Sequence, residues 1–498
     1  MFTRGKYWYD FELKDESRLH KDISDHNRKE GAKSSGAQLL DAFAYYNYSL
    51  ADKPGTVRLG KQVVSWGEST FIGNSINSIN PIDVAAFRRP GAEIKEGLIP
   101  VNMFFLSQGL TDSLSAEAFY QLEWDQTVID NCGTFFAGTD VAADGCDSNY
   151  NILDPASIAQ LQAASAAGLL PGVNVTSEGL MVRRGPDRDA RDSGQWGLTL
   201  RWLGDETEYA AYAMNYHSRT PIVGMQAADR QGILDTLAAA GGPLGMAAVQ
   251  PMLLGRGNYF LEYPEDIRLY GLSFSTVLPT GTAWQGELSY RPNMPLQTNT
   301  SDLTPKLVTS VTDPFLASGG SPLVALAQAG NVTHGYNRKE VTQAQTTFTH
   351  FFDQVMGAER VTLVGEVGVT RVGGMTNEIG ARYGRDAVFG LPENALAEQR
   401  YGSHGFFDST SWGYRARAIW DYSDVFAGVN LKPNLAWSHD VSGYGPVFNE
   451  GSKAFSLGLD AEYQNTYTAS LSYTNFFDGD YNTLTDRDFI ALSFGVNF

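Results

Sequence analysis

The sequence predicts an all-β protein: one transmembrane antiparallel β-barrel domain of about 16 strands spanning residues 1–498. Three observations predict it. Apolar and polar residues alternate with a period of two along segments of about ten residues. Aromatic residues gather at the ends of these segments, and the connections between them are alternately short and long. Strands of a soluble β-sandwich also alternate, but they average only about five or six residues.

The candidate strands follow one another along the whole chain. In the clearest one, Tyr467, Ala469 and Leu471 share a face, and serine and threonine residues occupy the other. The chain opens inside such a pattern without a signal peptide, so we expect a leader and a pair of strands before it, which gives about eighteen strands in the full-length protein. The candidate strands are 2–14, 36–50, 56–65, 98–107, 113–124, 194–203, 208–218, 266–278, 281–291, 340–354, 360–371, 411–422, 425–437, 453–464, 466–477 and 488–498.

The long connections are expected on the extracellular side and the short ones on the periplasmic side. They are partly helical, because 155–170 repeats apolar residues at every third position and 226–240 predicts a second short helix. The uncharged run 236–255 contains two prolines and four glycines, so we expect an apolar loop there, and likewise at 321–330. The predicted extracellular loops are 125–193, 219–265, 292–339 and 372–410.

Composition excludes several other classes of protein. With 37 basic and 56 acidic residues the formal charge is −19, which argues against a nucleic-acid partner. Two cysteines exclude a disulfide-rich scaffold and a cysteine-based zinc module. Cys132 and Cys146 lie in a polar stretch rich in glycine and aspartate, which favours a disulfide in an oxidising compartment; two free cytosolic thiols are the alternative.

Residues 66–97 are the best candidate for a functional segment. They join an outward-running strand to an inward-running one, yet they hold many apolar and charged residues for an exposed loop. Folding into the lumen buries the apolar side and pairs the charges with a polar wall, so we expect a constriction or gate. The alternative is that the charges only tie the loop to the wall. The expected gate residues are Trp66, Glu68, Asp83, Arg88, Arg89, Glu93, Lys95 and Glu96.

Inward-facing charges recur along the predicted wall. Glu117, Glu123, Arg415 and Arg417 are the expected lumen partners of the gate. Other inward positions include Glu287, Arg291 and Glu366. These charges either line an ion-selective path or neutralise one another in a polar lumen.

Enzyme motifs are absent from the sequence. The seven histidines form no H-E-x-x-H pattern, and neither G-x-S-x-G nor a phosphate-binding loop occurs, so we predict no catalytic residue and no cofactor. The acidic stretches 140–147 and 187–192 have the carboxylates that Ca²⁺ prefers, although such loops are more often solvated or bridged by cations to lipopolysaccharide.

One stretch resembles a known family. Residues 57–101 contain Gly60-Lys61-Gln62, the box Trp66-Gly67-Glu68-Ser69, the turn Asn80-Pro81 with Asp83, and Arg88-Arg89-Pro90-Gly91. Glu117, Phe119, Tyr120 and Gln121, then Trp124 and Cys132-Gly133-Thr134, continue the pattern. The combination resembles the Gram-negative outer-membrane barrel family catalogued as domain of unknown function 1302. The resemblance implies a bacterial outer-membrane location and an association with catabolism or export of hydrophobic compounds beside inner-membrane transporters.

Three functional hypotheses result. The leading one is an outer-membrane channel or transporter for hydrophobic or amphipathic small molecules, gated by 66–97. The second is a general diffusive porin with a charged constriction. The third is a non-conducting barrel that docks an inner-membrane export system or a periplasmic lipoprotein. A closed lumen with an apolar pocket beneath the loops favours the first hypothesis, and an open water-filled bore favours the second. A closed lumen without a pocket favours the third. Outer-membrane lipid and lipopolysaccharide are partners under all three.

Overall fold

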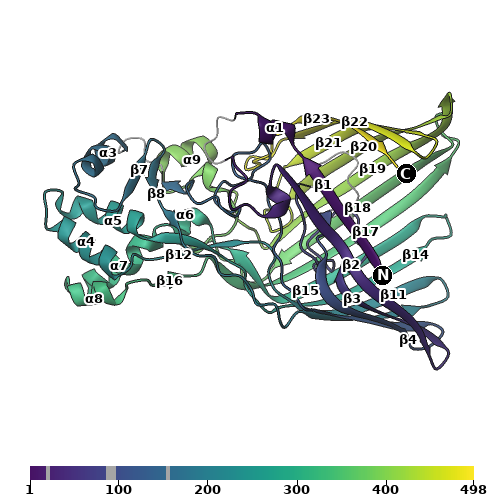
Figure 1. Cartoon of the computed structure of the whole chain (residues 1–498), viewed down its shortest axis with the longest axis horizontal. Coiled ribbons are helices and arrows are strands. Elements are labelled where there is room, and N and C mark those ends of the chain that lie inside the picture. The colour runs from purple at the N-terminus through teal and green to yellow at the C-terminus, as the bar shows by residue number, and fades with distance from the viewer. Residues whose placement is uncertain (18–22, 86–96, 153–157, 498) are drawn as a thin grey trace.

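The computed structural model describes residues 1–17, 23–85, 97–152 and 158–497. Within these residues, sixteen strands form one antiparallel sheet in which the neighbours follow chain order, and this sheet curls into a barrel wall (Figure 1). The predicted fold class is confirmed. The wall strands are β1 (Phe2–Tyr9), β2 (Ser35–Leu50), β3 (Lys53–Gln62), β4 (Val101–Gly109), β5 (Leu114–Gln121), β10 (Trp196–Leu203), β11 (Thr207–Tyr216), β14 (Ile267–Val277), β15 (Ala283–Gln297), β17 (Tyr336–Asp353), β18 (Arg360–Val372), β19 (Thr410–Phe426), β20 (Val429–Ser442), β21 (Lys453–Tyr463), β22 (Tyr467–Phe477) and β23 (Phe489–Val496).

Every predicted strand overlaps a wall strand, and the differences lie at the ends. The first strand stops at Tyr9 because Asp10 caps the short helix α1 (Phe11–Asp15), its side chain accepting from the Leu13 amide at 2.9 Å. Strand β19 extends past its predicted end to Phe426 and β20 begins only at Val429, so their turn is Ala427–Gly428. Within the described residues β1 and β23 are the two edges of the sheet and do not pair with each other.

The two faces of the wall differ as the alternation predicts. Outward Leu198 and Phe494 are 45% and 78% exposed, whereas inward Thr199 is fully buried. Near a short turn, outward Trp202 and Tyr209 stack with their ring centroids 5.6 Å apart. An apolar outer band with aromatic residues near its ends is the architecture of a bacterial outer-membrane barrel, and it places this chain in that membrane.

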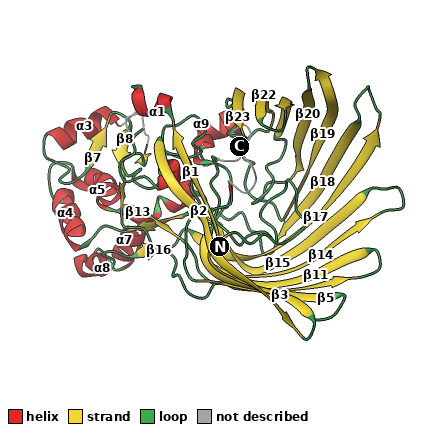
Figure 2. Cartoon of the chain, turned by 45° about the vertical axis from the view of Figure 1, so that its right-hand side comes forward, coloured by secondary structure: helices red, strands yellow, loops and turns green. Residues whose placement is uncertain are grey.

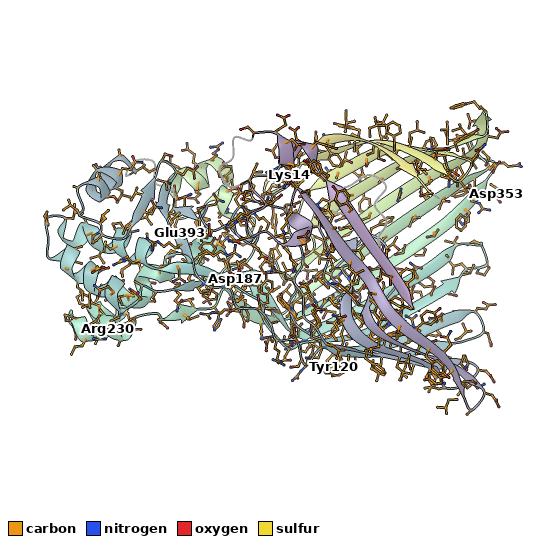
Figure 3. All side chains as sticks on the ribbon, viewed as in Figure 1. Lys14, Tyr120, Asp187, Arg230, Asp353 and Glu393 are labelled. Carbon is orange, nitrogen blue, oxygen red and sulfur yellow. A yellow bond between two sulfur atoms is a disulfide. The ribbon has the colours of Figure 1, made fainter. Side chains whose placement is uncertain are left out.

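The long connections form a layer of short helices and small sheets on one end of the wall (Figure 2). Glu393 and Arg230 lie in this layer, and Asp353 marks the opposite, short-turn end (Figure 3). None of the helices described is long and apolar enough to cross a membrane. The elements of the layer formed by the long connections are β6 (Asn151–Ile152), α3 (Ile158–Ala166), β7 (Asn174–Thr176), β8 (Gly179–Met181), β9 (Arg183–Arg184), β12 (Ile222–Gln226), α4 (Arg230–Ala240), η3 (Gly245–Ala248), α5 (Val249–Arg256), β13 (Asn258–Glu262), α6 (Thr300–Leu303), α7 (Lys306–Ala317), α8 (Pro322–Ala327), β16 (Val332–Thr333), η4 (Ala387–Phe389) and α9 (Ala395–Tyr401).

The prediction of an apolar loop over 236–255 is wrong, because α4, η3 and α5 occupy most of it. Pro251 lies in the first turn of α5, where its missing amide leaves no hydrogen bond unmade. Met252 and Leu253 of the same helix are buried, so packing stabilises a helix that composition disfavours. Similarly, α8 forms within 321–330 with Pro322 at its first position.

Cys132 and Cys146 form a disulfide inside the loop 125–193, with their Cα atoms 6.2 Å apart. Both cysteines are fully buried. The predicted pairing is confirmed.

Candidate functional site

The candidate site begins where β3 ends, and we call residues 64–85 the inner segment. Trp66 is buried against the inner face of the wall, where its Nε1 donates to Glu117 Oε2 on β5 at 2.8 Å. Its ring packs on Phe119 of β5 and Tyr212 of β11, with centroids 5.1 and 5.9 Å away. The indole thus ties the start of the inner segment to the wall through one hydrogen bond and apolar contact.

The next contact is made by Glu287 on β15, a wall carboxylate that is 5% exposed. Its Oε2 accepts from the Glu68 amide at 2.6 Å, and its Oε1 accepts from Gln345 Nε2 at 3.2 Å. Gly67 has a φ of +91°, and a Cβ there would lie 2.5 Å from Glu287 Oε2. Only glycine lets the backbone approach this carboxylate so closely.

The tip of the inner segment is held by Glu366 on β18, which is 1% exposed. Its carboxylate accepts from three consecutive backbone amides, those of Thr70, Phe71 and Ile72, at 3.1, 2.6 and 2.8 Å. Hydrogen bonds to an ionised acceptor are roughly twice as strong as neutral ones. Glu366 is therefore the main anchor of the tip.

Glycines on the wall make room for the apolar side chains of the inner segment. A Cβ on Gly368 would lie 2.9 Å from Ile72, and one on Gly271 would lie 2.8 Å from Ile76. Each isoleucine thus fills a notch in the wall, where a larger inward residue would push it away.

The inner segment then returns towards β3 and β4. Arg291 on β15 donates through Nη2 to the Ser75 carbonyl at 2.6 Å and to Ser78 Oγ at 3.0 Å. Asn80 accepts from the Val64 amide at 3.1 Å and donates to the Ile99 carbonyl at 3.0 Å, which closes the excursion. The inner segment therefore runs out from β3 as far as β18 and comes back.

Of the remaining predicted gate residues, Asp83 and Glu68 are among the residues that the structure describes, and the other five are not. Buried Asp83 accepts from Lys6 Nζ of β1 at 3.2 Å, and its amide donates to the Gly97 carbonyl at 2.7 Å. Burial is the largest cause that raises the pKa of Glu68, to about 7, with Arg201 acting in the opposite direction. Arg88, Arg89, Glu93, Lys95 and Glu96 lie outside the described residues.

Of the four predicted wall residues, Glu117 contacts the inner segment through Trp66. Glu123 accepts from Asn102 Nδ2 at 2.5 Å, and Arg415 donates to Asp440 Oδ1 at 2.6 Å, so these two bind other parts of the wall. Arg417 is half-buried. Sequence periodicity placed Glu287, Arg291 and Glu366 on the inner face, but it gave no sign that they hold the inner segment.

A cavity of about 1630 Å³ lies between the inner segment and the extracellular layer. Asn77 and Ser78 form part of its floor, and Tyr150, Val308 and Phe407 line it from the loops. Its lining is apolar or uncharged at nearly every position; the charged lining residues are Arg219, Arg385 and Asp386. A large, weakly charged cavity suits a hydrophobic or amphipathic molecule better than an ion.

The acidic loops offer no preformed metal site in the part of the chain that the structure describes, where no group of three or more histidine, cysteine, aspartate or glutamate side chains is arranged to hold an ion. Asp140 accepts from the Gly133 amide at 2.7 Å, and Asp192 accepts from the Trp124 amide at 2.8 Å. These carboxylates therefore shape the loops. The calcium hypothesis gains no support from their arrangement.

Comparison with known families gives a match along the whole chain, residues 1–498, to the family described as "Protein of unknown function (DUF1302)". The chain belongs to this family. No curated protein matches the sequence.

Three solved structures are distantly similar to this family member. OccAB1 of Acinetobacter baumannii is 10% identical with a TM-score of 0.33, covering 89% of this chain and 74% of that one. The outer-membrane channel DcaP of the same organism is 7% identical with a TM-score of 0.32, covering 95% and 92%. OprB of Pseudomonas putida is 9% identical with a TM-score of 0.32, covering 96% and 89%.

Proposed function

We propose that this protein is an outer-membrane channel or transporter that captures hydrophobic or amphipathic small molecules in the cavity beneath its loops. Residues 66–97 gate the passage from that cavity into the barrel. The cavity itself carries the proposal, because it is large, nearly uncharged, and floored by residues of the inner segment. The protein catalyses no reaction under this proposal.

The contacts of the inner segment support a gate that can be released. Its tip is attached to β18 by Glu366, and its middle to β15 by Glu287, through hydrogen bonds to backbone amides. Ile72 and Ile76 contact the wall glycines Gly368 and Gly271 through van der Waals packing alone. Such a segment undocks when a few polar contacts are exchanged for water, while the surrounding wall stays intact.

The cavity is tested by placing a large side chain inside it. Thr309 of α7 lines the cavity, whereas Thr312 of the same helix does not. We expect Thr309→Trp to lower the binding of a neutral hydrophobic dye, N-phenylnaphthylamine, to the purified full chain in uncharged detergent. Uptake of the same dye into liposomes carrying the protein falls in parallel.

Thr312→Trp is the matched control, since it adds the same side chain to the same helix outside the cavity, and it leaves binding and uptake unchanged. Equal dye binding by the parent and Thr309→Trp proteins, with both barrels folded, contradicts the proposal.

The porin hypothesis has one observation in its favour. Inward-facing Arg417 and Glu462, on β19 and β21, are partly exposed on the inner face of the wall. A diffusive porin gives a high, steady ion conductance in planar bilayers and shows no saturation of dye uptake. A gated passage gives low conductance that rises when the inner segment is released.

A further inference from the structure

We propose that the cavity selects amphipathic anions, with the carboxylate or sulfonate headgroup bound at Arg219 and the apolar body against the loops. This inference rests on the proposed function, because it names the class of molecule that the same cavity takes. The headgroup position is defined by Arg219, which lines the cavity beside the returning arm of the inner segment.

Arg219 is a buried cation held by neutral acceptors. It is 7% exposed. Its Nη1 donates to the Asp125 carbonyl at 2.8 Å, and its Nη2 donates to the Ile79 carbonyl at 3.2 Å and to Gln195 Oε1 at 2.9 Å, with Gln121 Oε1 as a further acceptor. Its Nε is buried and has no hydrogen-bond partner. Burial lowers the pKa of Arg219 to about 10, so the guanidinium stays charged at neutral pH.

A second buried guanidinium lies directly behind the floor. Arg291 is fully buried, and its Nε donates to the hydroxyl of Tyr216 at 2.9 Å. Its Nη2 reaches Ser78 Oγ, and Arg219 reaches the carbonyl of the next residue, Ile79. Tyr216 and Ser78 both line the cavity, and Nη1 of Arg291 has no partner. Two positive charges thus converge on consecutive residues of the inner segment.

Among the other buried arginines, Arg385 donates to backbone carbonyls and to the Tyr481 hydroxyl, whereas Arg382 has carboxylate partners. Arg382 donates to Asp302 at 2.6 Å and to Glu393 at 2.8 Å. Arg219 and Arg291 make no ion pair with any residue that the structure describes, although acidic residues outnumber basic ones by 56 to 37 in the chain. Asp386, the acidic lining residue, already accepts from the Val388 amide at 2.9 Å.

An anionic headgroup supplies the missing counter-charge. A buried charge without a counter-ion is costly, and an anion that enters with an apolar body offsets that cost while the body fills the cavity. The headgroup competes with the Ile79 carbonyl for Arg219, so binding loosens the part of the inner segment that returns towards β3 and β4. A neutral molecule of the same shape fills the cavity but leaves Arg219 on Ile79.

The test uses two dyes that share one aromatic body. Anilinonaphthalene sulfonate carries a sulfonate that N-phenylnaphthylamine lacks. Both are titrated into the full chain in uncharged detergent, and the signal of each dye in the same detergent without protein is subtracted as the micelle background. We expect the sulfonated dye to bind on the order of tenfold more tightly than the neutral one, the effect of one charge-assisted contact.

Variants at Arg219 show whether the preference arises there. Arg219→Gln abolishes the preference while the neutral dye still binds, which also shows that the barrel is folded. Arg219→Lys keeps most of the preference, because it keeps the charge. Arg183→Gln is the matched control: it removes one charge from an exposed arginine of the same layer and changes nothing.

The failures of the two proposals are distinguishable. If both dyes bind with equal affinity and Thr309→Trp lowers the binding of each, the anion inference is overturned and the proposed function stands. An anion preference that survives in Arg219→Gln overturns the assignment of the headgroup to Arg219. If Thr309→Trp displaces neither dye, the proposed function itself fails.

Discussion

Replacing Glu366 by alanine removes the acceptor of three consecutive backbone amides at the tip of the inner segment. Glu366 is 1% exposed, so water does not screen these hydrogen bonds. A hydrogen bond to a charged group contributes about 1.5–3 kcal/mol, and an amide left without a partner costs a similar amount. Because the three bonds share one carboxylate and the released tip regains water, we expect a net loss of about 3 kcal/mol in docking free energy.

A loss of that size raises the undocked population roughly 150-fold. Hydrogen exchange measures it directly, since the amides of Thr70, Phe71 and Ile72 should lose protection by that factor in Glu366→Ala. Single-channel recordings in planar bilayers should show more frequent or larger openings. Glu366→Gln keeps one acceptor oxygen but brings an amide group towards the backbone amides, so it falls between the parent and alanine proteins.

Glu462→Gln is the control for this experiment, because Glu462 also faces the lumen but lies on β21, away from the inner segment. It should leave exchange and conductance as in the parent. Retained protection at residues 70–72 in a folded Glu366→Ala barrel would refute the anchoring role. Lost protection with unchanged conductance would keep the anchor and refute the gate.

Other contacts give further expected outcomes. In Gly67→Ala the new Cβ would lie 2.5 Å from Glu287 Oε2 at a residue whose φ is +91°. We therefore expect docking of the inner segment to become about 1–3 kcal/mol less favourable, which is measured as a loss of amide protection. Gly73→Ala meets no atom within 4 Å and should keep that protection. Replacing Cys132 and Cys146 by serine should destabilise their loop by about 3 kcal/mol, seen as faster limited proteolysis, whereas thiols that alkylate without reductant in the parent would contradict the disulfide. Burial raises the pKa of Glu68 from 4.5 to about 7, so the docked segment binds a proton that the undocked one releases. Amide protection factors of the inner segment should therefore fall in the parent as the pH rises from 4.5 to about 7, and stay constant in Glu68→Gln. The same dependence on pH in both proteins would contradict the assignment of this effect to Glu68.

The wall could be predicted from the sequence because each strand faces two different media. Lipid on one side and a polar lumen on the other require an apolar residue at every second position, and that pattern is local. The same periodicity placed Glu287, Arg291 and Glu366 on the inner face. It also placed the disulfide pair in one loop, since Cys132 and Cys146 are only 14 residues apart.

The path of the inner segment was decided by the tertiary structure alone. The amide of Glu68 meets a carboxylate 219 residues away, and the amide of Phe71 meets one 295 residues away. Curling of the sheet brings β15 and β18 to these amides, and no local pattern encodes that distance. For the same reason α5 forms in a stretch rich in proline and glycine: the burial of Met252 and Leu253 among other loops outweighs the weak helix propensity of the sequence.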